Sequence, residues 1–234
     1  LSDEEIATLN SLAQVDDYMH LHRINFPHFA PVSLHLEARV SAADMPGTWG
    51  FGFWNDPFSG GFGSGGMRRI LPVLPNAAWF FYGSEPNQLS LRNGISGKGF
   101  HAKVFRSPLL PSFLSLLALP SLPFFLWPFT ARFLRRAVRV LVKEDAVPLE
   151  INVTGWHQYH LTWRESGVEF MVDQRPMFTS PISPLGKLGL VIWIDNQYFK
   201  FTSEGQIGLG FLPTHQIQSM DIRNLTLVQD NGYD

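Results

Sequence analysis

The amino-acid sequence predicts an all-β fold that forms one domain with a single insertion. Most of the chain reads as runs of about four to eight residues, rich in aromatic and β-branched side chains and separated by Gly, Pro, Asn and Ser. The chain has 234 residues, and a single β sandwich often runs to roughly 200–250 residues. We therefore expect residues 1–234 to form a single β-sandwich domain, interrupted by an insertion at residues 107–148.

The first clear strand lies at residues 33–40, where apolar and polar residues alternate. Successive side chains of a strand point to opposite faces, so this alternation predicts a strand with one buried face. The buried face would carry Leu34, Leu36, Ala38 and Val40.

A second segment, at residues 76–83, is aromatic on both faces and carries no acid. Alternation places Ala77, Trp79 and Phe81 on one face and Ala78, Phe80 and Tyr82 on the other. The next acid along the chain is Glu85, at the end of the segment.

The insertion begins with an uncharged stretch at residues 107–131, which consists mostly of Leu, Phe, Pro and Ser. On length alone this stretch could span a membrane. Its prolines would break a continuous helix repeatedly, so we do not expect a spanning helix. The breaks fall at Pro108, Pro111, Pro120, Pro123 and Pro128.

Residues 132–143 predict an amphipathic helix with a basic face. The cations are Arg132, Arg135, Arg136, Arg139 and Lys143, with Phe133, Ala137, Val140 and Leu141 largely on the other side. Such a helix beside an apolar segment is typical of an element that lies on an anionic membrane surface. The alternative is packing on the sandwich or between protomers, which we favour because large apolar patches mark interfaces of several kinds. The membrane or partner surface would consist of Phe124, Trp127, Arg132, Arg135, Arg136 and Arg139.

A late strand at residues 188–195 alternates in the same way as the first. Leu188, Leu190, Ile192 and Ile194 would share one face, and Gly189, Val191, Trp193 and Asp195 the other. The second face could be a binding surface.

Charge and cysteine content exclude several classes of protein. The formal net charge is −2 and only 16% of residues are charged, which argues against a nucleic-acid partner, since phosphate neutralisation needs clustered excess cations. The absence of cysteine excludes a disulfide framework, a thiolate nucleophile and a cysteine-based zinc site. The compartment stays open, with an extracytoplasmic or membrane-peripheral location favoured.

Three aromatic segments, at residues 47–57, 156–163 and 168–173, resemble the concanavalin A-like lectin/glucanase superfamily, in particular laminarinase- and lichenase-type glycoside hydrolases. The resemblance extends roughly from residue 33 to residue 227, without the insertion. It implies a two-sheet jelly-roll sandwich whose concave sheet binds a glycan chain.

The same resemblance implies a fold without the hydrolysis. In those enzymes the strand that matches residues 76–83 carries Glu-x-Asp-x-x-Glu, and this segment has no acid. Retaining glycosidases need two carboxyl groups about 5–5.5 Å apart. A displaced pair, Asp56 or Glu85 with Asp195, is the remaining catalytic alternative.

Carried over by resemblance, the ligand-binding residues are Trp54, Asn55, Tyr82, Glu85, Trp193, Asp195 and Asn196. We assign Trp156, Tyr159 and Trp163 mainly to the core. No cofactor is expected. A structural calcium is an option for which Asp16, Asp17 or Asp221 would supply oxygens, and the metal content is otherwise unknown.

These observations predict a non-hydrolytic carbohydrate- or glycolipid-binding protein, with residues 107–143 facing a membrane surface or a second copy of the chain. One alternative is an enzyme, either a glycoside hydrolase with displaced carboxylates or a cyclase or isomerase acting on an apolar substrate. A structural or assembly subunit is the third alternative. An open groove with exposed Trp54 and Trp193 would favour the binding protein, and a filled groove the structural subunit.

Overall fold

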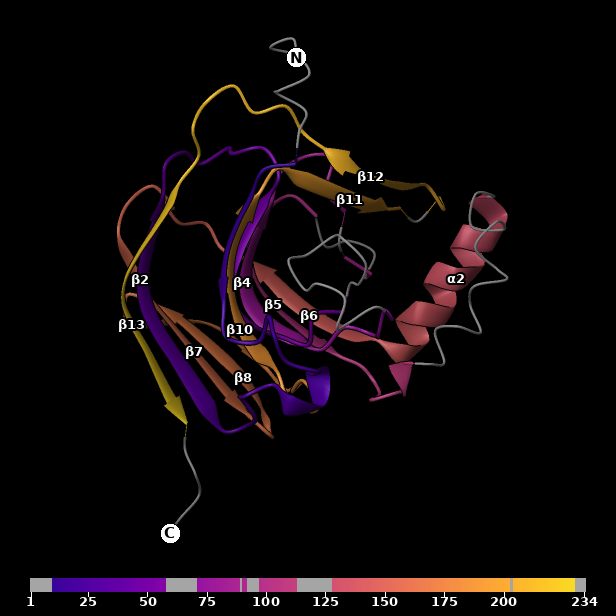
Figure 1. The fold of residues 1–234 in the computed structure, drawn as a ribbon, viewed down its shortest axis with the longest axis horizontal. Helices are drawn as coiled ribbons and strands as arrows, with labels where there is room; N and C mark the ends of the chain where they lie inside the picture. The colour runs from indigo at the N-terminus through magenta and orange to yellow at the C-terminus, as the bar shows by residue number, and fades with distance from the viewer. Residues whose placement is uncertain are drawn as a thin grey trace.

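Two antiparallel sheets pack face to face in the computed structural model, which describes residues 10–57, 71–88, 90–91, 97–112, 128–202 and 204–229 (Figure 1). The six-stranded sheet has, in spatial order, β1 (Leu12–Asp16), β10 (Gly189–Asp195), β3 (Thr48–Trp54), β4 (Ala77–Gly83), β5 (Gly99–Arg106) and β6 (Lys143–Pro148). The five-stranded sheet has β13 (Met220–Gln229), β2 (Val32–Val40), β7 (His157–Arg164), β8 (Gly167–Val172) and β9 (Arg175–Ser180). The predicted all-β, two-sheet jelly-roll sandwich is confirmed.

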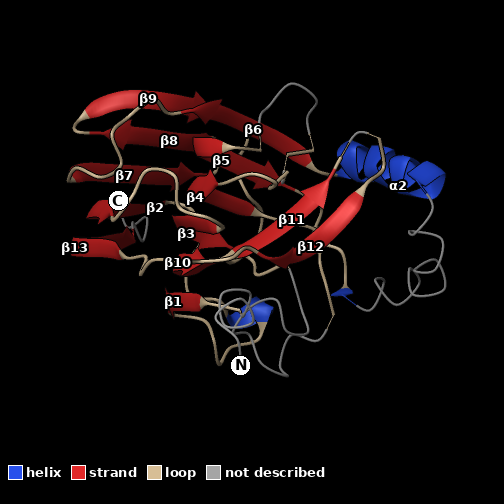
Figure 2. Ribbon diagram, turned by 90° about the horizontal axis from the view of Figure 1, so that it is seen from above, coloured by secondary structure: helices blue, strands red, loops and turns tan. Residues whose placement is uncertain are grey.

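Three smaller elements complete the description. A two-stranded ribbon of β11 (Gln197–Phe201) and β12 (Ile207–Phe211) extends from the end of β10 toward helix α2 (Pro128–Leu141), as Figure 2 shows. A short 3-10 helix, η1 (Arg23–Asn25), lies between β1 and β2. Helix α2 lies on the side of the six-stranded sheet that faces away from the five-stranded sheet (Figure 1).

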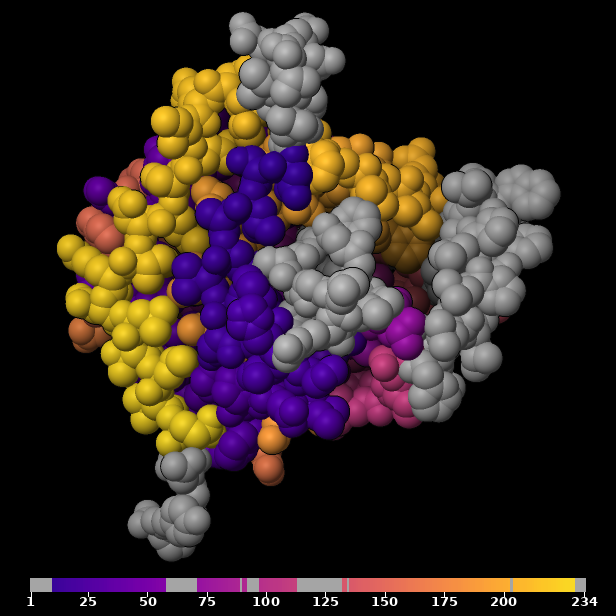
Figure 3. All heavy atoms as spheres, viewed as in Figure 1, coloured from indigo at the N-terminus to yellow at the C-terminus, as the bar shows by residue number. Residues whose placement is uncertain are grey.

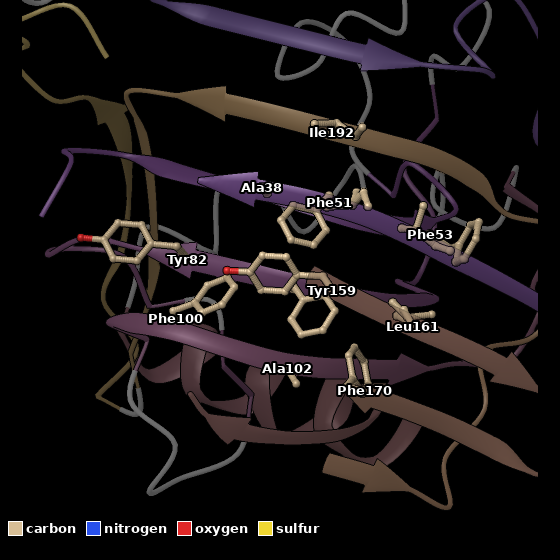
Figure 4. Packing of buried hydrophobic residues seen from close by; sticks show 14 of the residues in the cluster. Ala38, Phe51, Phe53, Tyr82, Phe100, Ala102, Tyr159, Leu161, Phe170 and Ile192 are labelled. Atoms are coloured by element: carbon tan, nitrogen blue, oxygen red, sulfur yellow. The ribbon is translucent and has the colours of Figure 1, made fainter. Parts of the chain in front are cut away.

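The core between the sheets is built from the alternation that the sequence predicts (Figure 4). From β2 it takes Leu34, Leu36, Ala38 and Val40, and from residues 188–192 it takes Leu188, Leu190 and Ile192. Phe80 of β4 packs edge-on against Tyr159 of β7 and Phe170 of β8, with ring centroids 5.1 Å apart in both pairs. The register of these strands therefore places their apolar faces as expected.

Strand β4 is buried along its whole length. Ala78, Phe80 and Tyr82 belong to the core between the sheets, whereas Ala77, Trp79 and Phe81 belong to a second apolar cluster on the outer face of the six-stranded sheet. The predicted division of residues 76–83 between two faces is confirmed.

One of the three aromatic residues assigned to the core lies elsewhere. Tyr159 and Trp163 are buried between the sheets, but Trp156 is only half-buried. Its ring lies between the guanidinium groups of Arg39 and Arg223, at 5.0 and 4.1 Å. Trp156 precedes β7, so no strand alternation directs its ring inward, and stacking with two cations stabilises it at the surface. The assignment of Trp156 to the core was wrong.

Helix α2 confirms the predicted helix but not its single basic face. Arg132, Arg136 and Arg139 are exposed, whereas Arg135 is 5% exposed. The Arg135 side chain donates hydrogen bonds to the carbonyl oxygens of Ser90 and Phe201, at 3.0 and 3.2 Å.

The inner side of α2 explains this burial. Arg135, Val138 and Val142 follow the three- and four-residue spacing of one helix face, and both valines pack in the outer apolar cluster. Lys143 begins β6 and lies outside the helix. Phe124 and Trp127, which the sequence assigns to the same surface, lie outside the described residues. Among the described residues no helix is both long and apolar enough to cross a membrane.

The contrast between two adjacent arginines predicts different stabilities for their variants. We expect Arg135→Ala to lower the free energy of unfolding by about 1–3 kcal/mol, because it leaves the buried carbonyl group of Ser90 and the partly buried one of Phe201 without their charged donor. Arg136→Ala, at an exposed position of the same helix, should change it by less than about 0.5 kcal/mol. Urea unfolding followed by circular dichroism measures both. Equal losses in the two variants would contradict the inward placement of Arg135.

Candidate ligand-binding face

The outer face of the six-stranded sheet gathers two of the three aromatic side chains that the sequence assigns to ligand binding, Trp54 and Trp193. We call it the aromatic face and define it by Trp54, Trp79, Phe81, Phe105 and Trp193, which all belong to or pack against the outer apolar cluster. The Trp79 ring lies 5.3 Å from the Trp193 ring and 5.7 Å from the Trp54 ring. Trp54 and Trp193 are nearly parallel, with centroids 6.3 Å apart and an interplanar angle of 5°.

A glycine in the middle strand makes this arrangement possible. In the sheet register Gly50 of β3 lies between Trp193 of β10 and Phe81 of β4. A Cβ at Gly50 would come within 2.7 Å of the Trp193 ring. Trp193 therefore lies directly over the backbone of β3, where any larger residue would displace it.

The N-terminal segment covers one end of the aromatic face. This part of the chain, drawn in indigo in Figure 3, lies on the visible side of the molecule, beside β13 in yellow. Tyr18 and Phe26 are fully buried within the outer cluster. Tyr18 packs on Gly189, where an added Cβ would lie 2.1 Å from the Tyr18 ring, and the indole N–H of Trp54 donates to the Tyr18 hydroxyl.

Val138 and Val142, in and just after helix α2, cover the other end. Between the two covers Trp79 and Trp193 are each 8% exposed, whereas Trp54 is half-buried. The sequence analysis did not predict that Tyr18 and Phe26 cover this face. The polar residues around them, mostly His and Asp, hide the two aromatic side chains from any strand or helix pattern.

The three indole N–H groups differ in their hydrogen bonds. Trp193 donates to the hydroxyl of Thr48 at 3.0 Å, and Trp54 donates to Tyr18. The indole N–H of Trp79 is buried, and no hydrogen-bond partner for it occurs in the part of the chain that the structure describes. Trp49 has an equally unpaired N–H, but it lies in the core between the sheets.

A buried ion pair joins β5 to β6 at the edge of the aromatic face. Lys103 and Glu144 approach to 3.0 Å, and their side chains are 3% and 0% exposed. Burial lowers the pKa of Lys103, and the Glu144 carboxylate opposes this effect. Glu144 also accepts the backbone N–H of Leu91 at 2.7 Å. The sequence signal for this pair is a lysine between Ala102 and Val104 in a strand that is buried at both neighbouring positions.

The other predicted ligand-binding residues do not join the tryptophans. Asn55 and Asn196 are buried and hydrogen-bonded to backbone: Asn55 bridges Leu74 and Asn76, and Asn196 bridges Ser11 and Leu212. Tyr82 lies in the core between the sheets, on the opposite face of β4. Glu85 is exposed and paired with Lys98 at 3.1 Å.

Asp195 lies at the far end of β10, opposite Thr48. Its carboxylate accepts the backbone N–H and the hydroxyl of Thr48 and the backbone N–H of Gln197. Burial raises the pKa of Asp195 to about 6, against the opposing effect of these hydrogen bonds.

Of the two displaced carboxylate pairs, that of Asp56 with Asp195 is excluded by the strand register, and that of Glu85 with Asp195 stays a prediction. Thr48, the partner of Asp195, begins β3, and Asp56 lies two residues beyond Trp54, the last residue of that strand. At a rise of about 3.3 Å per residue the two acids are separated by more than about 20 Å along β3. This separation is far beyond the distance at which two carboxyl groups act on one glycosidic bond.

The three aspartates named for calcium each have other partners. Asp16 accepts the backbone N–H groups of Tyr18 and Met19, Asp17 contacts His28 and accepts the N–H of Leu190, and Asp221 pairs with Arg39. No group of three or more His, Asp or Glu side chains that could hold a metal occurs among the described residues. Calcium binding stays a prediction.

A groove of about 330 Å³ crosses the outer face of the five-stranded sheet. His35 of β2 and His160 of β7 are cross-strand partners whose rings stack at 3.6 Å at its centre. Burial lowers the pKa of His160, and the charge of His35 adds to this effect. Glu37 at the rim accepts hydrogen bonds from Arg223 and Asn224.

No protein-family model matches this chain, and no curated protein matches its sequence. Similar solved structures include LamAcat from Zobellia galactanivorans, at 16% identity and a TM-score of 0.41 over 86% of this chain and 65% of that chain. The β-glucanase of Bacillus licheniformis matches at 10% identity and a TM-score of 0.41, over 87% of this chain and 68% of that chain. A legume lectin-like domain from Entamoeba histolytica matches at 11% identity and a TM-score of 0.45, over 96% and 83%.

Two of these neighbours, the β-glucanase and the legume lectin-like domain, correspond by name to the two classes in the sequence resemblance. At such low identities and TM-scores they carry no argument about the ligand or activity of this chain. Its function has to be inferred from its own residues.

The raised pKa of Asp195 predicts that Asp195→Asn increases the free energy of unfolding by an amount that depends on pH. The folded-state pKa of about 6 lies above the unperturbed value of 3.8, so folding favours the protonated carboxyl. The stability that the protonated Asp195 carboxyl contributes is fully present below about pH 4 and is lost as the pH rises through 6. An Asn side chain keeps the accepting oxygen and cannot ionise. Relative to the native protein, the variant should gain about 2–3 kcal/mol in free energy of unfolding between pH 4 and pH 8.

Urea unfolding at pH 4, 6 and 8 measures this difference. Asp221→Asn, which changes an exposed aspartate on the other sheet, is the matched control. A stability difference between Asp195→Asn and the native protein that stays constant with pH would contradict the prediction.

Proposed function

We propose that this chain is a non-hydrolytic carbohydrate- or glycolipid-binding protein whose ligand packs against the aromatic face. The observation that carries the proposal is the cluster of Trp54, Trp79 and Trp193, with the unpaired indole N–H of Trp79 among them. Tryptophan combines a broad apolar ring with one hydrogen-bond donor. A sugar ring presents a matching surface of apolar C–H groups edged by hydroxyl groups.

The unpaired donor favours a polar ligand over a hydrocarbon. A buried N–H without an acceptor costs about 1–3 kcal/mol. A ligand hydroxyl that accepts from Trp79 would remove this cost, whereas a purely apolar ligand would leave it in place. Nearly all the other buried side-chain donors of the described chain already have partners, so Trp79 is the group on this face that a ligand would satisfy.

The placement of the acids supports binding without hydrolysis. The side of β4 that carries Trp79 has no acid. Glu144 is neutralised by Lys103, and Asp195 is held by three hydrogen bonds at the end of β10. An enzyme acting on an apolar substrate would need a proton-transfer group that faces the tryptophans, and Glu144 meets this need only if the ion pair opens.

The burial of Trp79 and Trp193 favours a second candidate function, because Trp193 is expected to be exposed in a binding protein and covered in a structural subunit. At 8% exposure each, with Tyr18 and Phe26 packed over one end, these rings would also fit a secondary core. The chain would then be a structural or assembly subunit. Replacing Trp193 with Ala does not separate the two candidates, because it should cost about 3–5 kcal/mol of stability in either case.

Trp79→Phe separates them, because it removes the indole N–H and keeps an aromatic ring. A glycan array with the native protein first identifies the best ligand, with laminaritetraose among the probes, and calorimetry then compares the variants. We expect Trp79→Phe to weaken binding by about tenfold, the typical loss for one hydrogen bond.

Trp49→Phe is the matched control, since it removes an equally unpaired N–H from the core between the sheets and should leave affinity unchanged. If no oligosaccharide binds and Trp79→Phe unfolds at a higher temperature than the native protein, the aromatic face is a secondary core.

A further inference from the structure

Helix α2 has an exposed side that the sandwich does not use. Its inner side, with Arg135, Val138 and Val142, packs on the aromatic face and the ribbon. Phe133 and Val140 point away from that side and are 71% and 79% exposed. Large apolar side chains exposed to this degree on one side of a helix, two turns apart, mark a surface that something else covers.

The same exposed side carries a row of cations. Arg132, Arg136 and Arg139 are exposed along one edge of the apolar strip, and helix α2 contains no acid. The chain as a whole has a net charge of −2, so this positive charge is local to α2. At 100° per residue, Phe133, Ala137, Val140 and Leu141 occupy one sector of the exposed side, and the three arginines occupy the sector beside it.

The ribbon of β11 and β12 carries further exposed apolar side chains near α2. Ile207, Leu209 and Phe211 alternate with glycines and are all exposed. Ile207 is the cross-strand partner of Phe201, whose carbonyl oxygen accepts from Arg135. The apolar side chains of β12 therefore begin next to α2, and Figures 1 and 2 both show the ribbon reaching toward the helix.

We propose that the exposed side of α2 binds an anionic lipid surface. An amphipathic helix that lies in the plane of a membrane places its apolar strip at the boundary between headgroups and acyl chains, and its cations meet the lipid phosphates. The adjacent apolar and basic sectors of α2 match this arrangement. The buried Arg135 holds the helix on the sandwich while its other side stays accessible.

Of the four arginines predicted for this surface, Arg135 is the one that the proposal leaves out. Arg135 belongs to the fold, so a variant that changes it would lose lipid binding by unfolding α2. The exposed pair Arg136 and Arg139 tests the surface without touching the inner side. The proposal does not depend on the ligand of the aromatic face, because α2 contacts that face only through its inner side.

The experiment is sedimentation of the full chain with vesicles of phosphatidylcholine alone and of phosphatidylcholine with 30% phosphatidylserine. We expect pelleting with the anionic vesicles only, and weaker pelleting at about 0.5 M salt than at about 0.1 M, because salt screens the attraction. Arg136→Gln with Arg139→Gln should weaken binding by about 25-fold, at about fivefold for each lost cation. Arg136→Lys with Arg139→Lys should bind the vesicles like the native protein, because it keeps both cations.

Arg164→Gln with Arg175→Gln is the matched control. It removes the same charge from exposed positions of β7 and β9 and should leave binding unchanged. Circular dichroism verifies that every variant keeps its helix.

Two results would overturn the proposal. One is equal pelleting of the native protein and the Gln pair. The other is no pelleting with either vesicle while gel filtration shows a dimer that Phe133→Ser with Val140→Ser dissociates. The second result would assign this surface to a copy of the chain.

Discussion

The six-stranded sheet is apolar on both faces, and the rest of the structure follows from this constraint. In β3 and β4 nearly every side chain is buried, whichever way it points. The inner face is covered by the five-stranded sheet, as in any sandwich. The outer face needs a second cover, because aromatic rings left in water would forfeit about 25 cal/mol for each Å² of apolar surface. The N-terminal segment and helix α2 provide that cover.

Covering the outer face brings polar groups into an apolar environment, and each is compensated in its own way. Lys103 and Glu144 neutralise each other, and Arg135 is satisfied by two backbone carbonyl groups. Asp195 keeps three donors and a raised pKa. The indole N–H of Trp79 is the exception. The proposed binding role rests on this donor together with the neighbouring rings of Trp54 and Trp193, because the packed core between the sheets also holds an unpaired indole N–H, that of Trp49.

Helix α2 links the covered face to the surface. Its inner side completes the cluster around the tryptophans, and its outer side carries exposed apolar and basic residues. A ligand on the aromatic face and a partner on the outer side of α2 would therefore act on one element from its two sides. Arg135 donates hydrogen bonds to the backbone of β11 and of Ser90. These bonds fix which side of the helix faces the sandwich and which side stays exposed.

The sequence by itself determined the strands and the direction of their side chains. The alternation at residues 33–40, 76–83 and 188–195 is a local property, because the backbone of a strand turns successive side chains to opposite faces. The absence of acids in β4 and the presence of a helix at residues 132–143 were equally local, although the helix in fact begins at Pro128 and ends at Leu141. Only the tertiary structure decided which apolar faces are covered, and by what. Tyr18 reaches Gly189 from far along the chain, Arg135 turns inward because Ser90 and Phe201 offer carbonyl groups, and Trp156 stays outside between two arginines. These contacts join residues that no spacing along the chain relates, so their energies arise only when the sheets have formed.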